Sequence, residues 1–237
     1  MANIRPYLII NNKSSDTIIG LLISKLAPIS KPQILTQVET VAGRDGDIVT
    51  PLGYAAYDKN VEIGLTYEYN IDDVIAFFNQ EGKVVFSNEP DKYYKFSIYK
   101  QIDFNRLIRF KKATVTFHVQ PFKYSDEESV KTFTEKEFNI RNNGNIYSRP
   151  TITINGSGTL NLYINGSQIL TIELGNTTRE IIISGWEMNA YNSDGALLNR
   201  LVSGNYDKMI LKSGENNIKI VGGNIVNVKV DNYSRWI

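Results

Sequence analysis

The chain has 237 residues, 42% of them hydrophobic and 22% charged, which is enough apolar material for one large or two ordinary domains. Lys and Arg number 26 against 25 Asp and Glu, so a net charge of +1 gives no overall field that would attract nucleic acid or an anionic membrane. The absence of cysteine excludes disulfides and thiolate sites, and the single histidine disfavours a zinc site. We therefore expect no metal, no cofactor, no specific nucleic-acid partner and no membrane partner.

One segment has the periodicity of a helix, which we expect at about residues 71–81. Its apolar positions are spaced i, i+3, i+4 and i+7. Asn70 is the expected N-cap, and Gly82 follows the expected end. Because strand-like patterns lie on both sides of it, we expect this helix to pack on a sheet. The expected stripe is Ile71, Val74, Ile75 and Phe78.

The segments around this helix alternate between apolar and polar residues, as half-buried strands do. Val115, Phe117 and Val119 fall on one face of an expected strand at 113–120, and a similar strand is expected at 92–100. Proline lacks the backbone N–H that a sheet ladder needs, so we expect Pro121 to stop the strand or to place it at an edge.

The composition changes near residue 140, and we place the domain boundary there. Residues 1–140 are predicted to form an N-terminal domain built on a sheet with one helix, and residues 141–237 a C-terminal β-sandwich of galectin or jelly-roll type. The last strand is a candidate to return to the N-terminal domain. Asn165-Gly166 and Gly222-Gly223 are expected to be hairpin turns. The fold class is therefore mainly β.

Few residues suit catalysis, and we expect no catalytic residue and no enzyme activity. His118 lies on the polar face of an alternating strand, where a general base would also need a positioned partner in a cleft. Acidic groups at Asp72-Asp73, at 126–128 and at Glu135 with Glu137 have structural explanations as a helix start, a solvated loop and an outer strand face.

A basic cluster precedes the strand at 113–120 and has two interpretations. It can be a cationic loop or one side of a subunit contact, and a single-strand nucleic-acid platform is the less economical alternative. The cluster consists of Arg106, Arg109, Lys111 and Lys112, with Phe104 and Phe110 between them.

Four motifs occur in an order that resembles the distal tail proteins of siphophages, which are long-tailed bacteriophages. Each motif is weak alone, but their succession covers about two hundred residues. They are Val-x-Gly-Arg-Asp-Gly at 41–46, Val119 to Tyr124, Asn142-x-Gly144 to Ser148-x-Pro150 leading into 152–156, and Leu211 with Gly214-x-Asn216-x-Ile218.

The resemblance implies a structural protein at the tip of a long non-contractile phage tail, made in the host bacterial cytoplasm and carried in the virion. It implies that the N-terminal domains, each a β-barrel-like fold with one helix, form a homo-hexameric ring that joins the tail tube to the tail-tip protein. The galectin-like C-terminal domains would project outward from this ring. The implied partners are the tail tube protein, the terminus of the tape-measure protein and the tail-associated lysin or fibre protein.

A ring needs two different complementary patches on each subunit. We expect the run Lys31 to Thr50 to form a protruding hairpin that reaches a neighbouring subunit. Its turn at Gly43, Arg44, Asp45 and Gly46 is the candidate inter-subunit contact, and a turn with only a local role is the alternative.

Two other functions compete with the structural one. A carbohydrate-binding module for host cell-wall saccharide would use exposed aromatic rings for stacking. A glycoside hydrolase would need two marked carboxylates, and none is marked. The candidate saccharide-stacking residues are Trp186, Tyr163, Tyr191 and Trp236.

Overall fold

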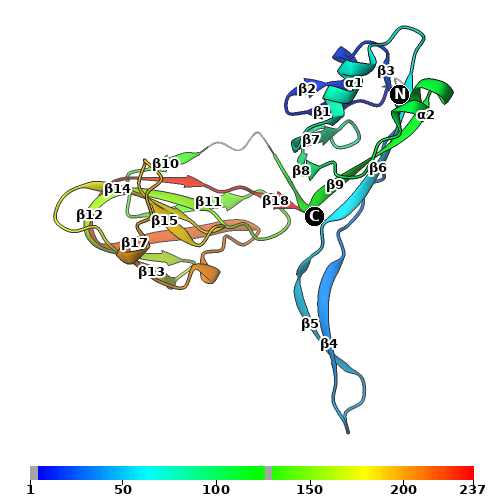
Figure 1. The fold of residues 1–237 in the computed structure, drawn as a ribbon. Helices are drawn as coiled ribbons and strands as arrows, with labels where there is room; N and C mark the ends of the chain where they lie inside the picture. Colours follow the sequence, from blue (N-terminus) through cyan, green and yellow to red (C-terminus); the bar gives the residue numbers. More distant parts are fainter. Residues whose placement is uncertain (1–4, 126–129) are drawn as a thin grey trace. The chain divides into compact units, whose positions relative to one another are not determined.

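The structure is a computed structural model, and it describes residues 5–125 and 130–237. The chain forms two compact units, one of residues 1–124 with Ile237 and one of residues 125–236 (Figure 1). The sequence prediction divided the chain later, after residue 140. The difference arises because β10 (Lys131–Phe133) and β11 (Glu137–Asn142) pair with the C-terminal strand β17 (Gly214–Asp231). The mainly β fold is confirmed.

The N-terminal unit is built on one antiparallel sheet in the order β2-β1-β7-β8-β9-β6-β3. The alternation predicted for its longest strand is confirmed, because Val115, Phe117 and Val119 are all completely buried. They belong to one hydrophobic core that also includes residues of every other strand of this order except β2. The strands are β1 (Leu8–Ile10), β2 (Lys13–Ser14), β3 (Leu21–Lys25), β6 (Tyr57–Leu65), β7 (Gly82–Phe86), β8 (Tyr93–Ser97) and β9 (Lys112–Tyr124).

The predicted helix is present as α1 (Ile71–Phe78), with Asn70 as its N-cap. The Asn70 side chain accepts a hydrogen bond from the Asp72 N–H at 3.1 Å. The helix ends three residues earlier than expected, because Gly82 already begins β7. Its buried stripe also differs from the prediction, since Phe77 is buried and Ile75 is exposed. The stripe packs on the core of the sheet, as expected for a helix between strands.

The basic cluster contains a second helix, α2 (Phe104–Phe110), where the sequence indicated a loop. The Asp103 carboxylate accepts a hydrogen bond from the Arg106 N–H at 2.8 Å and caps the helix start. Leu107 is its only buried residue, so there is no repeated apolar stripe for sequence analysis to detect. The helix stops at Lys111, whose φ of +57° is left-handed.

Pro121 does not end the strand, which is a correction to the sequence prediction. β9 continues to Tyr124, and Pro121 lies beyond its last pair with β6, Tyr57 with Val119. The register with β8 also shifts in this region, between Tyr94 and Phe96. Proline is tolerated here because the regular ladder is already interrupted.

A two-stranded ribbon, which we call the arm, separates β3 from β6 in the sequence. It consists of β4 (Ile34–Thr40) and β5 (Asp47–Tyr54), paired with each other and with no other strand of the described residues. Every residue of β4 is exposed. Figure 1 shows the arm extending away from the sheet of its own unit.

The C-terminal unit is organised around two long strands, β12 (Thr151–Ile164) and β17. The first half of β12 pairs with β14 and with the second half of β17, and the second half of β12 pairs with β13 and with the first half of β17. Both halves bury their apolar faces in a single core. The other strands are β13 (Ser167–Glu173), β14 (Arg179–Ser184), β15 (Asn189–Tyr191), β16 (Val202–Gly204) and β18 (Arg235–Trp236), and the short 3₁₀ helices of the two units are η1 (Ser15–Thr17), η2 (Asn199–Leu201) and η3 (Tyr206–Lys208).

Of the two predicted hairpin turns, one is present and one is absent. Asn165 and Gly166 both have positive φ and join β12 to β13, as a two-residue hairpin requires. Gly222 and Gly223 lie inside β17 instead, where the register with β12 shifts. A Cβ on Gly223 would lie 2.4 Å from the Ser157 carbonyl oxygen, so glycine is needed here for close approach of two backbones rather than for a turn.

The packing around Phe117 gives a test of the N-terminal core. Its ring contacts those of Phe78, Phe86 and Phe96 at centroid distances of 6.3, 5.6 and 5.3 Å. Phe117→Ala should lower the free energy of unfolding of this unit by about 3–5 kcal/mol, because it removes a buried ring and leaves a cavity. The exposed Thr114→Ala on the same strand is the control.

Urea unfolding can assign the loss to one unit. Trp186 belongs to the C-terminal unit, so in a Trp236→Phe background its fluorescence reports that unit while far-UV circular dichroism reports both units. We expect Phe117→Ala to shift only the dichroism transition of the N-terminal unit. An unshifted dichroism curve would contradict the assigned core.

Candidate functional site

The tip of the arm is the turn that the sequence predicted. Gly43 and Gly46 have φ values of +82° and +78°, and the Arg44 N–H donates to the Val41 carbonyl at 3.2 Å. A Cβ added to either glycine would meet nothing within 4 Å, so glycine is favoured here by backbone conformation alone. Arg44 and Asp45 are exposed to solvent at this tip.

The two faces of the arm can be assigned from its register, since directly paired residues of an antiparallel ribbon lie on one face. Val38 pairs with Val49 and Thr40 with Asp47, and these alternate pairs share one face. Val38 is 55% exposed and Val49 is 58% exposed. The Thr40 hydroxyl donates to the Asp47 carboxylate at 2.7 Å. This face therefore presents an apolar pair beside a carboxylate.

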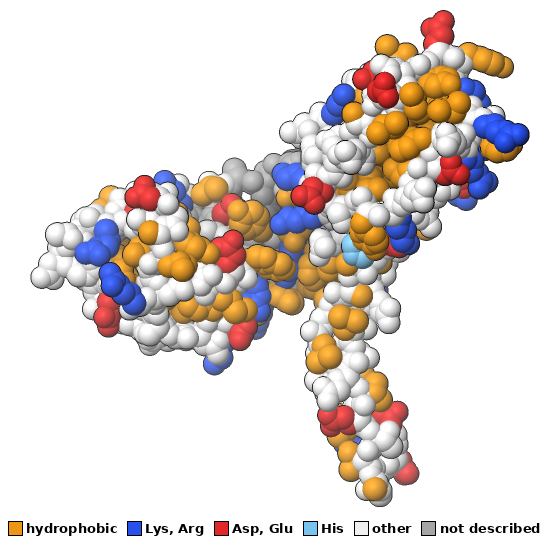
Figure 2. All heavy atoms as spheres, in the orientation of Figure 1, with side chains coloured by type: hydrophobic (Ala, Val, Ile, Leu, Met, Phe, Trp, Pro, Cys, Tyr) orange, Lys and Arg blue, Asp and Glu red, His pale blue; other side chains and the backbone are white. Residues whose placement is uncertain are grey.

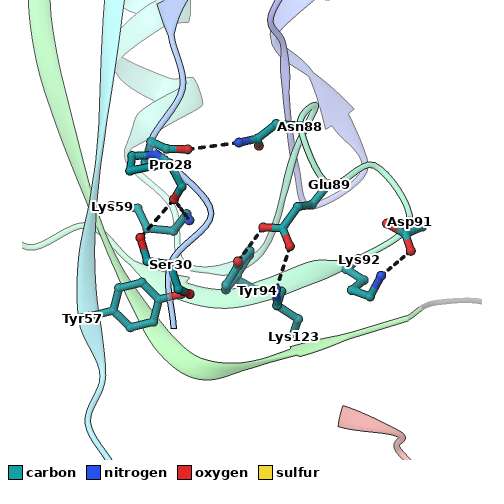
Figure 3. Close-up of polar contacts among 11 residues, drawn as sticks. Pro28, Ser30, Tyr57, Lys59, Asn88, Glu89, Asp91, Lys92, Tyr94 and Lys123 are labelled. Atoms are coloured by element: carbon teal, nitrogen blue, oxygen red, sulfur yellow. Dashed lines mark hydrogen bonds and ion pairs between the residues drawn. The ribbon is translucent and has the colours of Figure 1, made fainter. Parts of the chain in front are cut away.

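The base of the arm is held by a buried polar network that we call the anchor, shown in Figure 3. Lys59 on β6 is only 2% exposed, and its ammonium donates to the Pro28 carbonyl at 2.9 Å. The Tyr57 hydroxyl donates to the Ser30 carbonyl at 3.3 Å. Pro28 and Ser30 lie in the segment that leads into β4, whereas Tyr57 and Lys59 follow β5. The anchor thus ties together the two segments that enter and leave the arm.

The second half of the anchor is an ion pair with little access to water. The Glu89 carboxylate binds the Lys123 ammonium at 2.7 Å and accepts a hydrogen bond from the Tyr94 hydroxyl at 2.7 Å. The side chains of Lys123 and Glu89 are 7% and 9% exposed. Burial in this surrounding raises the pKa of Tyr94, so its hydroxyl remains a donor.

Among the described residues no carboxylate contacts Lys59 directly, and burial lowers the pKa of its ammonium. Its ammonium is compensated by rings instead, 5.0 Å from the centroid of Tyr94 and 5.3 Å from that of Phe86. The sequence analysis did not single out this residue. Extending the alternation of Val61 and Ile63 backwards by two residues places Lys59 on the buried face, and that is the signal that could have found it.

His118 does have a positioned partner, which the sequence did not indicate. Its Nδ1 lies 2.9 Å from Asp58 Oδ1 and 3.1 Å from the Tyr99 hydroxyl. Its side chain and that of Asp58 are 29% and 31% exposed on the outer face of the sheet. The Lys100 ammonium beside Asp58 holds the pKa of that carboxyl below its usual range. A hydrogen-bonded pair on an open strand surface suits a contact or a stabilising role better than a general base in a cleft.

The basic cluster is exposed around α2, with Arg106, Arg109 and Lys112 outward. They line an open hollow of about 610 Å³ together with Asp103, Asn105 and Phe110. Lys111 is half-buried, and its ammonium lies 4.2 Å from the centroid of the Tyr69 ring. The exposed basic residues of the cluster therefore line one open hollow beside α2.

The four aromatic residues predicted for saccharide stacking do not form one platform. Trp186 lies in the turn after β14, 60% exposed, and the Arg235 guanidinium lies 5.7 Å from its ring centroid. Tyr191 donates its hydroxyl to Glu187 at 2.5 Å. Tyr163 lies near the opposite end of β12 from the segment that pairs with β14, and it donates to Gln168 at 3.0 Å. Trp236 is half-buried in β18.

Residues 5–125 and 130–237 contain neither a metal-binding cluster nor a membrane-spanning helix. No group of three or more His, Asp or Glu is placed to hold a metal ion. Within the same residues, no helix has the length and apolar character to cross a bilayer. Of the acidic residues named in the sequence analysis, Glu137 forms an ion pair with Lys219 at 2.9 Å. The acidic run at 126–128 lies outside the described residues.

Residues 16–119 match a family model described as the phage tail protein RIFT-related domain. The N-terminal unit therefore resembles a phage tail domain, and we call it the phage tail domain. Among curated proteins, no sequence matches the chain.

The fold of the whole chain resembles that of the Dit (gp 19.1) protein of phage SPP1, whose structure is described as a paradigm of the hub adsorption apparatus in phages that infect Gram-positive bacteria. The TM-score is 0.70 at 17% identity, and the match covers 95% of this chain and 97% of the other. Two baseplate structures of phage P2, with Ca and with Sr, match at a TM-score of 0.47 with 9% and 8% identity over 96% and 95% of this chain and 97% and 96% of theirs, which is too distant to support an argument. The resemblance to siphophage distal tail proteins is confirmed.

The matched segment of this phage tail domain includes the whole arm and most of its anchor. Lys59, Glu89 and Tyr94 lie inside residues 16–119, and Lys123 follows shortly after. The candidate functional site is therefore the arm with its anchor, a structural device within the phage tail domain.

The buried ion pair of the anchor can be tested by removing one charge. Glu89→Gln should lower the free energy of unfolding of the phage tail domain by about 3–5 kcal/mol, because it leaves the Lys123 ammonium buried without a counter-ion. The matched control is Asp91→Asn, since Asp91 pairs with Lys92 in the same loop but its side chain is 63% exposed. We expect the control to change stability by less than about 1 kcal/mol. Equal effects of the two variants in urea unfolding would contradict the role of the anchor.

Proposed function

We propose that this protein is the distal tail, or baseplate hub, protein of a long non-contractile phage tail, located at the tail tip of the virion. Six copies form a ring through their phage tail domains, which joins the tail tube to the tail-tip, fibre or lysin protein and receives the terminus of the tape-measure protein. The protein acts as a scaffold and transforms no substrate.

The observation that carries this proposal is the exposed but anchored arm. Val38, Val49 and Leu52 are each more than half exposed, and none belongs to the core of their own unit. Exposed apolar side chains gathered on a projecting element are typical of a surface that another protein covers. The anchor fixes the direction of the arm before assembly, which reduces the conformational entropy lost on binding.

A closed ring needs contacts between neighbouring subunits, and a projecting arm can make such a contact. Each subunit of a closed ring contacts its neighbour through two different patches. An arm that reaches out of one subunit is one patch, and the neighbour supplies the second. The match of residues 16–119 to a phage tail domain supports the assignment of this contact to tail assembly.

Native mass spectrometry and negative-stain images over rising protein concentration test the ring. We expect closed six-membered rings with a central channel. A monomer at the highest concentration, or open chains of variable length, would contradict the proposal.

The tip of the arm can be tested separately. Arg44→Ala combined with Asp45→Ala should raise the concentration at which half of the subunits assemble by about tenfold, which corresponds to about 1.4 kcal/mol per contact. Asp194→Ala, in an exposed turn of the C-terminal unit, is the control. If assembly is unchanged in the double variant, the tip is only a local turn.

A second candidate function, recognition of host cell-wall saccharide, is favoured by one observation. Trp186 is 60% exposed, and the Arg235 guanidinium lies 5.7 Å from its ring centroid and 4.6 Å from that of Tyr147. A rigid exposed indole is a surface on which a sugar can stack. Calorimetric titration with cell-wall polysaccharide should show binding that Trp186→Ala abolishes and Tyr163→Ala retains. An absence of heat with the unaltered protein would remove this candidate.

A further inference from the structure

We propose that the arm of one subunit docks on the surface around α2 of the next subunit. This proposal rests on the proposed ring and names the second patch that the ring requires. The receiving surface, which we call the α2 surface, consists of Asp103, Asn105, Arg106, Arg109, Phe110 and Lys112.

The α2 surface carries an excess of positive charge that its own unit does not neutralise. Residues 103–112 contain four basic residues and one acidic residue, a net charge of +3. Asp103 is occupied as the helix cap. Within the described residues, no ion pair involves Arg106, Arg109 or Lys112. The hollow between these side chains can therefore accept a carboxylate.

The same surface also has an apolar component. Phe110 is 63% exposed, and the guanidinium of Arg109 lies 5.4 Å from its ring centroid. Ile108, the residue before Arg109 on the same helix, is 37% exposed. An exposed phenyl ring beside free guanidinium groups is the chemical complement of an apolar pair beside a carboxylate.

The arm presents that complement. Residues 34–54 contain three carboxylates and one arginine, a net charge of −2. Figure 2 shows acidic side chains near the free end of the arm and basic side chains over the α2 end of the same unit. On the face defined above, Asp47 lies next to Val38 and Val49. Asp47 has accepting capacity beyond its bond to Thr40, because a carboxylate can accept about four hydrogen bonds.

The geometry assigns the contact to a second copy. The arm joins β6 at Tyr57, whereas α2 joins β9 at Lys112, which pairs with Gly64 at the other end of β6. Seven residues of strand, about 24 Å, separate the two ends, and the arm extends away from the sheet (Figure 1). The two complementary patches therefore lie at opposite ends of one unit, as head-to-tail assembly requires.

A charge-reversal cycle tests the pairing. Asp47→Lys and Arg109→Glu should each raise the half-assembly concentration at least tenfold, because each places like charges together. The combined variant Asp47→Lys with Arg109→Glu should recover assembly to within about threefold of the unaltered protein. Additive losses in the combined variant would overturn the proposal. Asp194→Lys with Arg200→Glu, two exposed positions of the C-terminal unit, is the matched control.

Disulfide cross-linking gives a readout that does not depend on ring stability. The chain has no cysteine, so two introduced cysteines report one contact. Val49→Cys with Phe110→Cys should give a ladder of covalent oligomers up to six subunits under oxidising conditions. Val49→Cys with Val226→Cys, which uses an exposed residue of the C-terminal unit, is the control. An absence of the ladder in the first variant overturns the docking site.

The outcomes separate this inference from the function on which it rests. Rings that persist in both charge-reversal variants but are lost when residues 37–50 are replaced by a short turn would retain the hub and move the receiving surface elsewhere. A monomer at every concentration without cross-links would contradict both. Binding of a single-stranded oligonucleotide at low salt that Arg109→Glu abolishes, with assembly unchanged, would assign the α2 surface to nucleic acid instead.

Discussion

The anchor is the interaction on which the rest of the site depends. A two-stranded ribbon has no core of its own and is marginal in water, so its direction must be fixed at its base. Lys59 and Tyr57 bind carbonyl groups of the chain segment that enters the arm, and the ion pair of Glu89 with Lys123 fills the space beside them. Burying three charged groups is costly, and such groups are retained where they specify one arrangement. Here that arrangement is the position of the arm.

The two ends of the phage tail domain have complementary chemistry because of how the sheet is connected. β6 follows the arm and β9 follows α2, and the two strands are antiparallel neighbours. The arm and α2 are consequently displaced to opposite ends of one rigid sheet. In the docking that we propose, a second copy covers the exposed apolar and charged side chains of the arm and of the α2 surface. Such an assembly needs no change of fold.

In the C-terminal unit, the two long strands β12 and β17 contribute side chains to one core along most of their length. β12 and β17 remain paired over nearly their whole length, with register shifts where glycines bring the backbones close together. Gly156, Gly158 and Gly223 occupy this region, and a side chain at Gly223 would collide with the opposite backbone. Bulges at these positions bend the two strands while they stay paired, so that both halves of the pair contribute to a single hydrophobic core.

The sequence by itself determined the features that depend on local periodicity and turn chemistry: the mainly β class, the α1 helix capped by Asn70, the buried alternation of β9, the Asn165-Gly166 hairpin and the turn at the tip of the arm. Only the tertiary structure decided the features that depend on distant partners. The anchor joins residues from four separate segments, α2 has one buried residue and hence no stripe, and Pro121 and Gly222-Gly223 stay within strands because the neighbouring ladders are already irregular. Local alternation can place Lys59 on a buried face, but the groups that each of these residues meets lie far away in sequence, so no local pattern shows what holds them in place.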